Sequence, residues 1–489
     1  MSPELALMCV LGAPIVQAAL VLALPRPPGL RDVIHIGGSL FVAVSAFQLL
    51  GAAAQGEGAR IVLARPLPNV DLAFEIEPLG ALMAFVLTSL AALHAVHAAG
   101  IVRAKQEQAP ARLLAVIALT MSALAAVALS ANLFSFFVAY QALTLAAFPL
   151  VAHRGDEEAR PAARRFLAIL LASSTGLFLP AMIWTYALAG TLEFQPGGVL
   201  AGRVEPITAN VLLALFVLGL AMAAIPPLHR WLPASSRAPF PALVTIQALA
   251  VLPAGGIGLL KISAFVFGPA SMAMARYAAW GLIVLVGVGM CAAALIALSK
   301  RDVRERIAYS CMAQSLAVAM GALLALPAGL FAAALQVVAL ACAAATLLMA
   351  AGTTLAITGR TDVADYAGLG RVMPWTFAGF AIASASMIGL PPFAGAWAKL
   401  WLITAAAGSG LLWAAALASI AAILTFTHLA PLAANALAAR APADAFKRPD
   451  GASILLAAPV ILCAVATLSL LVFADSLAVF LAPIWTVSR

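Results

Sequence analysis

Long runs of apolar residues, separated by short polar connections, fill almost the whole chain. Each run is about 20 residues long, which is what a helix needs to cross a hydrocarbon core of roughly 30 Å. Lipid leaves the backbone of an open sheet without hydrogen-bond partners, so we expect an all-helical membrane protein. The pattern predicts fourteen helices, at residues 5–24, 32–53, 79–99, 111–129, 131–152, 163–190, 209–225, 240–267, 275–299, 304–326, 328–357, 374–407, 409–433 and 452–474.

The composition excludes a water-soluble globule. Of the 489 residues, 64% are hydrophobic and only 9% are charged, whereas roughly 25% of the residues in a soluble protein are charged. The mean hydropathy of +1.08 indicates the same class. Two polar stretches interrupt the helices: RIVLARPLPNVDLAFEIE within 54–78 alternates enough to predict a short β-hairpin, and 436–451 forms a polar linker.

The positions of the basic residues explain the net charge of +8. Twenty of the 27 Lys and Arg residues fall in the odd-numbered connections between predicted helices, and the even-numbered ones hold only Arg60, Arg65, Arg203 and Arg276. The positive-inside rule therefore predicts that the odd connections face the cytoplasm and that both termini lie outside. The basic excess reflects topology, and no nucleic-acid partner is expected.

No pattern in the chain predicts chemistry on a cofactor. The five cysteines all fall in apolar runs and form no CxxC pair, which is typical of packing residues. No metal-ligand cluster, phosphate-binding loop or Ser-His-Asp arrangement stands out. We therefore expect no cofactor, no metal and no catalytic site in this chain.

Two of the predicted helices are broken by a Pro-Pro pair beside a basic residue. AMAAIPPLHRWLPA contains Pro226 and Pro227, and IGLPPFAGAWAKLW contains Pro391 and Pro392. Proline removes a helix hydrogen bond and clashes with the preceding turn. One such pair alone favours an ordinary kink, but interrupted segments at corresponding places in two halves favour an inverted-repeat transporter with a site at each break.

Three motifs resemble those of the antiporter-like subunits of respiratory complex I and of Mrp-type cation/proton antiporters. PLHRWLPASSRAPFP is similar to that family's PLHxWLPxAxxxAPxPV, DVRERIAYSCMAQ to DIKRLIAYSSISQ, and GLPPFAGAWAKLWLI to GLPPFSGFxxKxxI. The resemblance implies two inverted five-helix repeats with helices 7 and 12 broken. The implied regions are 1–110 with helices 1–3, 111–267 and 275–433 as the repeats, and 434–489 as the C-terminal helix and tail.

The same resemblance implies a setting. Such subunits lie in the prokaryotic plasma (inner) membrane, work with other membrane subunits of a multisubunit complex, and move H⁺ or Na⁺ along a row of charged side chains at mid-membrane depth. Quinone would be met only through partner subunits.

The chain departs from the family in that charged row. Aligning the motifs puts neutral residues at the expected glutamate, lysine and histidine positions of helices 5, 7, 8 and 11: Gln141, Met222, Leu252 or Pro253, and Leu340. Only the helix-12 position keeps its charge, as Lys399. Because glutamine does not ionise and methionine carries no proton, the first half is predicted to be disabled as a lysine-based relay.

The remaining polar residues each allow two interpretations. Lys399 is a candidate for ion translocation, as intramembrane ionisable residues are by default, or a lysine whose head reaches the outer interface. His229 relays protons or caps broken backbone. Lys261, with no acid nearby in the sequence, is a polar pair inside the bundle or an interface anchor. The other candidates are Gln141 and Gln314, which hold water or bridge helices, and His428.

Two functions remain open on the sequence. In the first, the chain is an ion-translocating subunit that works through Lys399 in its second half. In the second, it is a degenerate scaffold homologue, or a membrane partner in an ion-driven inorganic-carbon uptake system, without transport of its own.

Overall fold

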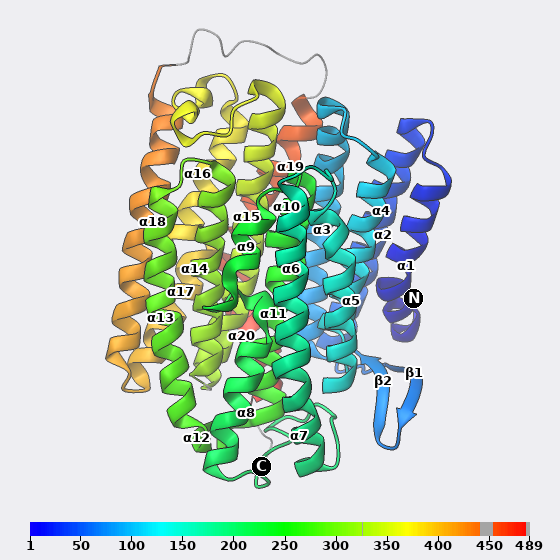
Figure 1. The fold of residues 1–489 in the computed structure, drawn as a ribbon, viewed down its shortest axis with the longest axis vertical. Helices are drawn as coiled ribbons and strands as arrows, with labels where there is room; N and C mark the ends of the chain where they lie inside the picture. The colour runs from blue at the N-terminus through cyan, green and yellow to red at the C-terminus, as the bar shows by residue number, and fades with distance from the viewer. Residues whose placement is uncertain (325, 441–452, 486–489) are drawn as a thin grey trace.

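The computed structural model describes residues 1–324, 326–440 and 453–485, most of them in helices that run side by side along the long axis (Figure 1). The helices are α1 Pro3–Ala23, α2 Pro28–Ala54, α3 Pro78–Lys105, α4 Pro110–Ala128, α5 Leu133–Val151, α6 Ala159–Ser173, α7 Leu179–Ala189, α8 Pro206–Gly219, α9 Trp231–Ser235, α10 Phe240–Val244, α11 Val251–Lys261, α12 Gly268–Met274, α13 Arg276–Ser299, α14 Val303–Leu323, α15 Pro327–Thr358, α16 Pro374–Ile388, α17 Ala394–Gly408, α18 Leu412–Ala438, α19 Ser453–Ala466 and α20 Ser469–Trp485.

Short π and 3₁₀ segments join or extend these helices. The π segments are η1 Ser174–Phe178, η4 Thr245–Leu249 and η5 Ile262–Phe267, and the 3₁₀ turns are η2 Ala221–Ala223, η3 Leu228–Arg230, η6 Val363–Tyr366 and η7 Leu369–Arg371.

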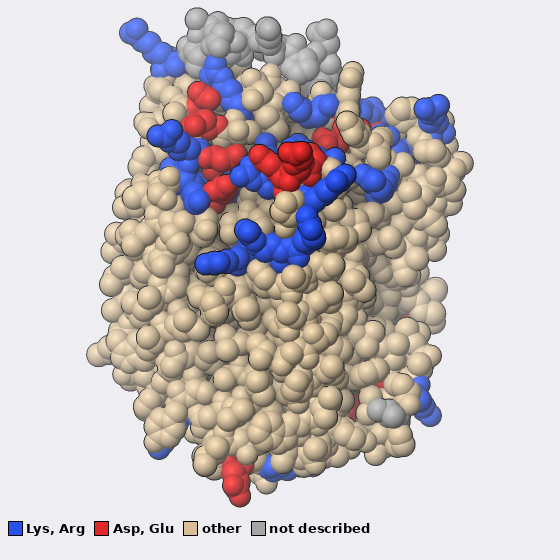
Figure 2. Space-filling view, in the orientation of Figure 1, with Lys and Arg blue, Asp and Glu red and all other residues tan. Residues whose placement is uncertain are grey.

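The chain is a multi-pass membrane protein. Within the described residues, ten helices are long and apolar enough to cross a bilayer, or eleven when Ile454–Ala466 and Ser469–Trp485, bent by 48°, count as one span. Charged side chains gather toward the two ends of the face shown in Figure 2, most densely at one end, and a wide uncharged band separates them. We call the densely charged end the basic end.

The predicted hairpin between the second and third helices is confirmed. Strand β1 (Arg60–Leu67) pairs antiparallel with β2 (Val70–Glu75), and Asn69 in the turn has a left-handed φ of 57°. The Arg60 guanidinium donates to both carboxylate oxygens of Glu193, at 2.7 and 2.8 Å, which ties the hairpin to the loop after α7.

The run predicted at 374–407 is interrupted at the predicted Pro-Pro break, where α16 and α17 are separated at residues 389–393. Other predicted boundaries were wrong. The last helix was predicted to end at 474, but α19 and α20 continue to Trp485. By contrast, the long run at 328–357 is one unbroken helix, α15. The linker predicted at 436–451 lies outside the described residues from 441 onward, together with Lys447 and Arg448.

The broken segments pack around two central, entirely buried elements. One is the stretch Phe240–Met274, which contains α10 to α12, and the other is the helix α15. In each, all residues of the most apolar part are buried. The helices α1 and α2 lie at the edge of the bundle and expose many apolar side chains (Figure 1). The first break is buried from Ala221 to Ile225, whereas Leu390, Pro391 and Pro392 of the second break are exposed.

Gly255 sets the closest approach between the central helix α11 and the first break. A Cβ at this position would fall into the backbone of Met222 and Ala223 in η2. Backbone cannot move aside as the end of a flexible side chain can, so only glycine fits.

We expect Gly255→Ala to lower the free energy of unfolding by about 1–3 kcal/mol, the usual cost of overpacking a close contact. Gly281→Ala on α13 is the matched control, because a Cβ there meets nothing within 4 Å. Thermal melts of the purified variants in mild detergent measure both. Equal melting temperatures of the two variants would contradict the close approach of α11 to the first break.

Candidate ion-translocation site

The first helix break leaves backbone groups that side chains satisfy. The helix α8 ends at Gly219, η2 follows, and Ala224 takes a left-handed φ of 56° just before Pro226 and Pro227. Three contacts satisfy the freed groups: Met222 N donates to the Tyr140 hydroxyl (2.9 Å), Trp231 Nε1 to Ala221 O (2.7 Å), and Ser315 Oγ to Ala223 O (2.8 Å). Every one of these side-chain partners is neutral.

The second break is satisfied differently. The helix α16 ends at Ile388, Gly389 takes a φ of 97°, and α17 resumes at Ala394 after Pro391 and Pro392. The backbone N–H of Gly395 donates to Ser386 Oγ at 3.2 Å, and that of Ala394 to Thr467 O at 2.7 Å. The carbonyl oxygen of Met387 instead accepts from an ammonium, that of Lys399.

Lys399 is held inside the bundle. Its Nζ donates to Gln314 Oε1 at 2.7 Å and to Met387 O at 2.9 Å, and the residue is only 8% exposed. Its aliphatic stem lies against Gly389, where a Cβ would meet the Lys399 Cδ at 2.6 Å. The side chain thus turns back onto its own break, and its head does not reach the outer interface.

Gln314 extends this contact to a third helix. Gln336 of α15 donates to the same Oε1 at 3.1 Å, so one amide oxygen accepts from both Gln336 and Lys399. Gln314 and Gln336 are 3% and 2% exposed. The Oε1 of Gln336 has no hydrogen-bond partner. The cluster has no acid among these contacts, so its charge comes from the ammonium alone.

Helix α14 connects the two breaks. Its neighbouring residues Gln314 and Ser315 point to opposite sites: Gln314 binds Lys399 at the second break, and Ser315 binds the carbonyl of Ala223 at the first. Successive helix residues point about 100° apart, which lets one turn serve both sites. A shift of α14 would therefore disturb both breaks at once.

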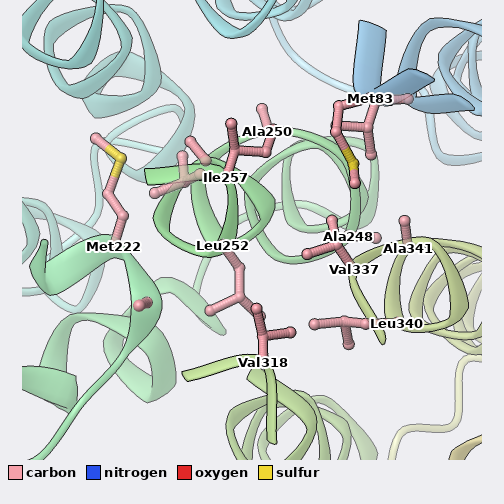
Figure 3. Packing of buried hydrophobic residues seen from close by; sticks show 14 of the residues in the cluster. Met83, Met222, Ala248, Ala250, Leu252, Ile257, Val318, Val337, Leu340 and Ala341 are labelled. Carbon is pink, nitrogen blue, oxygen red and sulfur yellow. The ribbon is translucent and has the colours of Figure 1, made fainter. Parts of the chain in front are cut away.

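An apolar layer separates the cluster from the first half. Figure 3 shows Leu252, Val318 and Leu340 pointing toward one another between α11, α14 and α15. These three and Met222 are at most 2% exposed and belong to one buried hydrophobic core. The implied charged positions at Met222, Leu252 and Leu340 are thus packed with hydrocarbon, and a lysine-based relay through the first half has no groups at these positions.

The other predicted candidates lie in separate contacts. Gln141 accepts from the Ser174 hydroxyl at 2.9 Å on α6–η1. His428 has both ring nitrogens engaged, with Ser310 Oγ at 2.7 Å and Leu424 O at 3.1 Å. His229 is half-buried just after the first break, and its Nδ1 has no partner. The described contacts bring together only Lys399 and Gln314 among the predicted set.

Lys261 forms a polar pair inside the bundle, one of its two interpretations, with an acid that is distant in the sequence. Its fully buried Nζ lies 3.1 Å from Glu77 Oε1 and donates to Ser130 O at 3.0 Å, with the Phe194 ring centroid 5.2 Å away. Glu77 also caps α3, accepting from the N–H groups of Leu79 and Gly80 at 2.8 Å each. This ion pair ties α11 to the starts of α3 and α5.

A polar cavity opens at the basic end beside the first break. Its volume is about 620 Å³, and its charged lining is Glu158, Arg165, Arg230, Arg237, Lys300 and Glu305. Arg237 pairs with Glu158 at 2.9 Å, and Lys300 with Glu305 at 2.9 Å. The hydrogen bond to Glu305 raises the pKa of Lys300. Water therefore reaches the edge of the first break from this end.

Sequence reasoning missed Gln336, Tyr140, Ser315 and two histidines of α3. His94 and His97 are both fully buried. Their i, i+3 spacing, which puts both on one helix face, was visible in the sequence. The polar residues at 140, 315 and 336 carry no local signal, because their partners lie on other helices.

The fold and the site define a multi-pass subunit built around two interrupted helices. The family described as "NADH:quinone oxidoreductase/Mrp antiporter, TM" matches residues 130–425, and the chain belongs to this family.

Among curated relatives, the NADH-quinone oxidoreductase subunit N of Desulforudis audaxviator is 27% identical over 431 residues, covering 86% of this chain and 84% of that protein. One component of the Na(+)/H(+) antiporter of Alkalihalophilus pseudofirmus is 26% identical over 284 residues, covering 57% of this chain and 56% of that one. The chain thus spans only about half the length of that antiporter component.

Solved structures share the fold over nearly the whole chain. A chain of the archaeal membrane-bound sulfane sulfur reductase superposes with a TM-score of 0.86 at 23% identity, covering 99% of this chain and 97% of that one. A chain of the Mrp complex from Dietzia gives 0.85 at 22% identity, with the same coverage. A chain of respiratory complex I from Thermus thermophilus gives 0.84 at 22% identity, covering 98% of each.

We expect Glu77→Gln to destabilise the protein by about 3–5 kcal/mol, because it removes the carboxylate that contacts the buried Lys261 ammonium. Adding Lys261→Met to this variant should recover most of the lost stability, since the buried ammonium is then gone as well. The midpoints of detergent-induced unfolding measure both. A double variant as unstable as Glu77→Gln would show that the ion pair is not the cause.

Proposed function

We propose that this chain is an antiporter-like subunit of a multisubunit membrane complex and that it translocates H⁺ or Na⁺ through its second half. The single observation that carries the proposal is the buried Lys399 ammonium, bound to Gln314 and to the Met387 carbonyl at a broken helix. An intramembrane charge is costly, and such groups mark ion pathways.

The chemistry of the cluster favours proton transfer at Lys399. An ammonium that gives up its proton becomes a neutral amine that still accepts a hydrogen bond, so the side chain keeps a partner in both states. Gln314 can bind both forms of Lys399, because its amide offers an acceptor oxygen to the ammonium and a donor nitrogen to the amine. For Na⁺, the same amide and carbonyl oxygens would be the ligands.

We further propose the family arrangement of two inverted five-helix repeats, 111–267 and 275–433, between the regions 1–110 and 434–489. Fourteen crossings result when the eleven apolar spans are joined by α8, by α14, and by α16 with α17 as one broken span. The likeness of the two breaks supports this arrangement, because in each a short apolar helix, α8 or α16, ends shortly before a Pro-Pro pair. The basic end would face the cytoplasm and both termini the outside.

The partners proposed are other membrane subunits in the plasma (inner) membrane of a prokaryote. The three structural neighbours are each chains of larger membrane complexes. Any quinone chemistry would then belong to partner subunits.

One observation favours the alternative of a scaffold without transport. The layer formed by Leu252, Val318 and Leu340 is fully apolar, so no lysine relay crosses it from one half to the other. Translocation therefore has to use the second half by itself. His229, Lys261, Gln141 and His428 remain secondary candidates for the ion path, and Lys261 is the least favoured because its donors are already engaged.

We expect Lys399→Met to lower ion flux at least tenfold while the complex still assembles. Methionine fills the volume of the lysine stem and removes the only ionisable group of the cluster. The tagged chain is purified with its partners in mild detergent, the partners are identified by mass spectrometry, and H⁺ and Na⁺ fluxes are measured in liposomes under an imposed potential.

The matched control is Lys105→Met, which removes an exposed lysine at the end of α3. It should leave flux unchanged. If Lys399→Met carries as much ion as the unmodified complex, the scaffold function is correct and translocation by this chain is excluded.

A further inference from the structure

Two histidines of α3 form a buried pair that the cluster around Lys399 does not use. His94 and His97 are fully buried, and their ring centroids lie 6.3 Å apart with the planes tilted by 34°. From the end of α3 at Lys105, they lie about 17 and 12 Å along the helix, at 1.5 Å per residue. Both therefore sit in the half of the bundle nearer the basic end.

Each ring bonds through Nε2 to a different neighbour. The Nε2 of His94 lies 2.9 Å from Pro241 O in α10 and 3.4 Å from Thr245 Oγ1 in η4. The Nε2 of His97 lies 3.1 Å from Thr353 Oγ1 on α15. The pair thus links α10, at the start of the stretch Phe240–Met274, to the central helix α15.

The opposite ring nitrogen of each histidine, Nδ1, has no hydrogen-bond partner. A carbonyl oxygen only accepts, so the contact with Pro241 assigns the proton of His94 to Nε2 and leaves Nδ1 as a bare lone pair. Leaving a buried acceptor unsatisfied is unfavourable, because the group loses its hydrogen bond to water without gaining another.

Other orphaned polar atoms lie on the segments that lead to this pair. Gln247 of η4 donates to Ser235 Oγ at 2.9 Å, yet its own Oε1 has no partner, and neither does Ser236 Oγ just after α9. Buried polar groups without a protein partner are the ones that ordered water satisfies. The polar groups run from the connection after the first break, through η4, to the histidines.

We propose that His94 and His97 form a proton-transfer pair that gives the first half the protonatable groups missing at Met222 and at Leu252 or Pro253. The pair would carry protons between η4 and α15, and the proposal rests on the proposed function of the chain as a translocating subunit. It assigns a role to a helix that lies outside both repeats.

The transfer balances without any electron donor or acceptor. A hydronium proton binds the bare Nδ1 of His94, which makes the ring an imidazolium, and the Nε2 proton leaves to water, which makes the ring neutral again in the other tautomer. The ring centroids lie 6.3 Å apart, and no direct hydrogen bond joins the two rings in the described residues. One water therefore passes the proton between His94 and His97, and ring rotation restores the starting tautomer.

Few other ionisable groups lie on the elements packed against α3. They are His35 and the Arg31–Asp32 ion pair of α2, Arg112 of α4, Cys342 of α15, Cys463 of α19 and Asp475 of α20. His35 is itself fully buried, and its Nε2 has no partner. No carboxylate is hydrogen-bonded or ion-paired to either ring in the described residues, so the rings pass a proton without a fixed counter-charge.

The test is His94→Gln in the purified complex, reconstituted in liposomes with an internal pH-sensitive dye and an imposed potassium diffusion potential. The glutamine amide replaces the Nε2–H donor to Pro241 and binds no proton. We expect at least a tenfold fall in H⁺ flux with unchanged assembly, and the same for His97→Gln. The control is His153→Gln outside the helices, whose Nε2 lies 2.9 Å from Gln108 O; it should keep normal flux.

Flux above half of normal in both His94→Gln and His97→Gln would overturn the proposal and leave the histidines a structural role. If neither variant assembles, Thr353→Val decides, since it keeps both rings and removes only the hydroxyl that His97 contacts; a severalfold loss supports the pair and normal flux excludes it. Loss of flux in Lys399→Met with normal flux in these variants rejects the histidine pair alone. Normal flux in Lys399→Met rejects the proposed function itself.

Discussion

The structure depends on satisfying the backbone groups that two broken helices release inside the membrane. An unpaired carbonyl or N–H in hydrocarbon costs several kcal/mol, so each break has to bring its own partners. At the first break, a phenol, an indole and a serine hydroxyl bind the freed groups of Ala221, Met222 and Ala223. At the second break, the Lys399 ammonium binds Met387 O.

This difference between the breaks makes the two halves unequal. Neutral caps and the apolar packing of Leu252, Val318 and Leu340 give the first break rigidity and no charge to move. The second break has a single ammonium held by neutral oxygens, without a carboxylate to fix its charge. Because α14 contacts both breaks through Gln314 and Ser315, a change in the Lys399 contact has a direct mechanical route to the first half.

The sequence predicted what local chemistry determines. Alternating residues predicted the hairpin, and Pro226–Pro227 and Pro391–Pro392 marked both interruptions, because each proline removes a backbone donor and clashes with the preceding turn. The neutral residues at 141, 222, 252 and 340 were readable by alignment with the family motifs. The depth of Lys399 within an apolar run predicted an intramembrane charge.

What depends on packing between distant segments could not be predicted. Glu77 is far from Lys261 in the sequence, and only the fold brings its carboxylate within 3.1 Å. The partners of Gln314, on α15 and α17, are likewise set by helix packing. His94 and His97 were absorbed into an apolar run, since hydropathy alone does not show that a ring nitrogen lacks a partner. The bend between α19 and α20 hid the true end of the last span.

The measurement that tests the account most directly is ion flux through the reconstituted complex carrying Gln314→Leu. Leucine keeps the approximate volume and removes the oxygen that binds Lys399, while Lys399 itself stays in the chain. The account predicts a fall of at least tenfold with normal assembly, because the ammonium loses its closest partner. Flux equal to that of the unmodified complex would contradict it, and would mean that ions pass elsewhere or not through this chain.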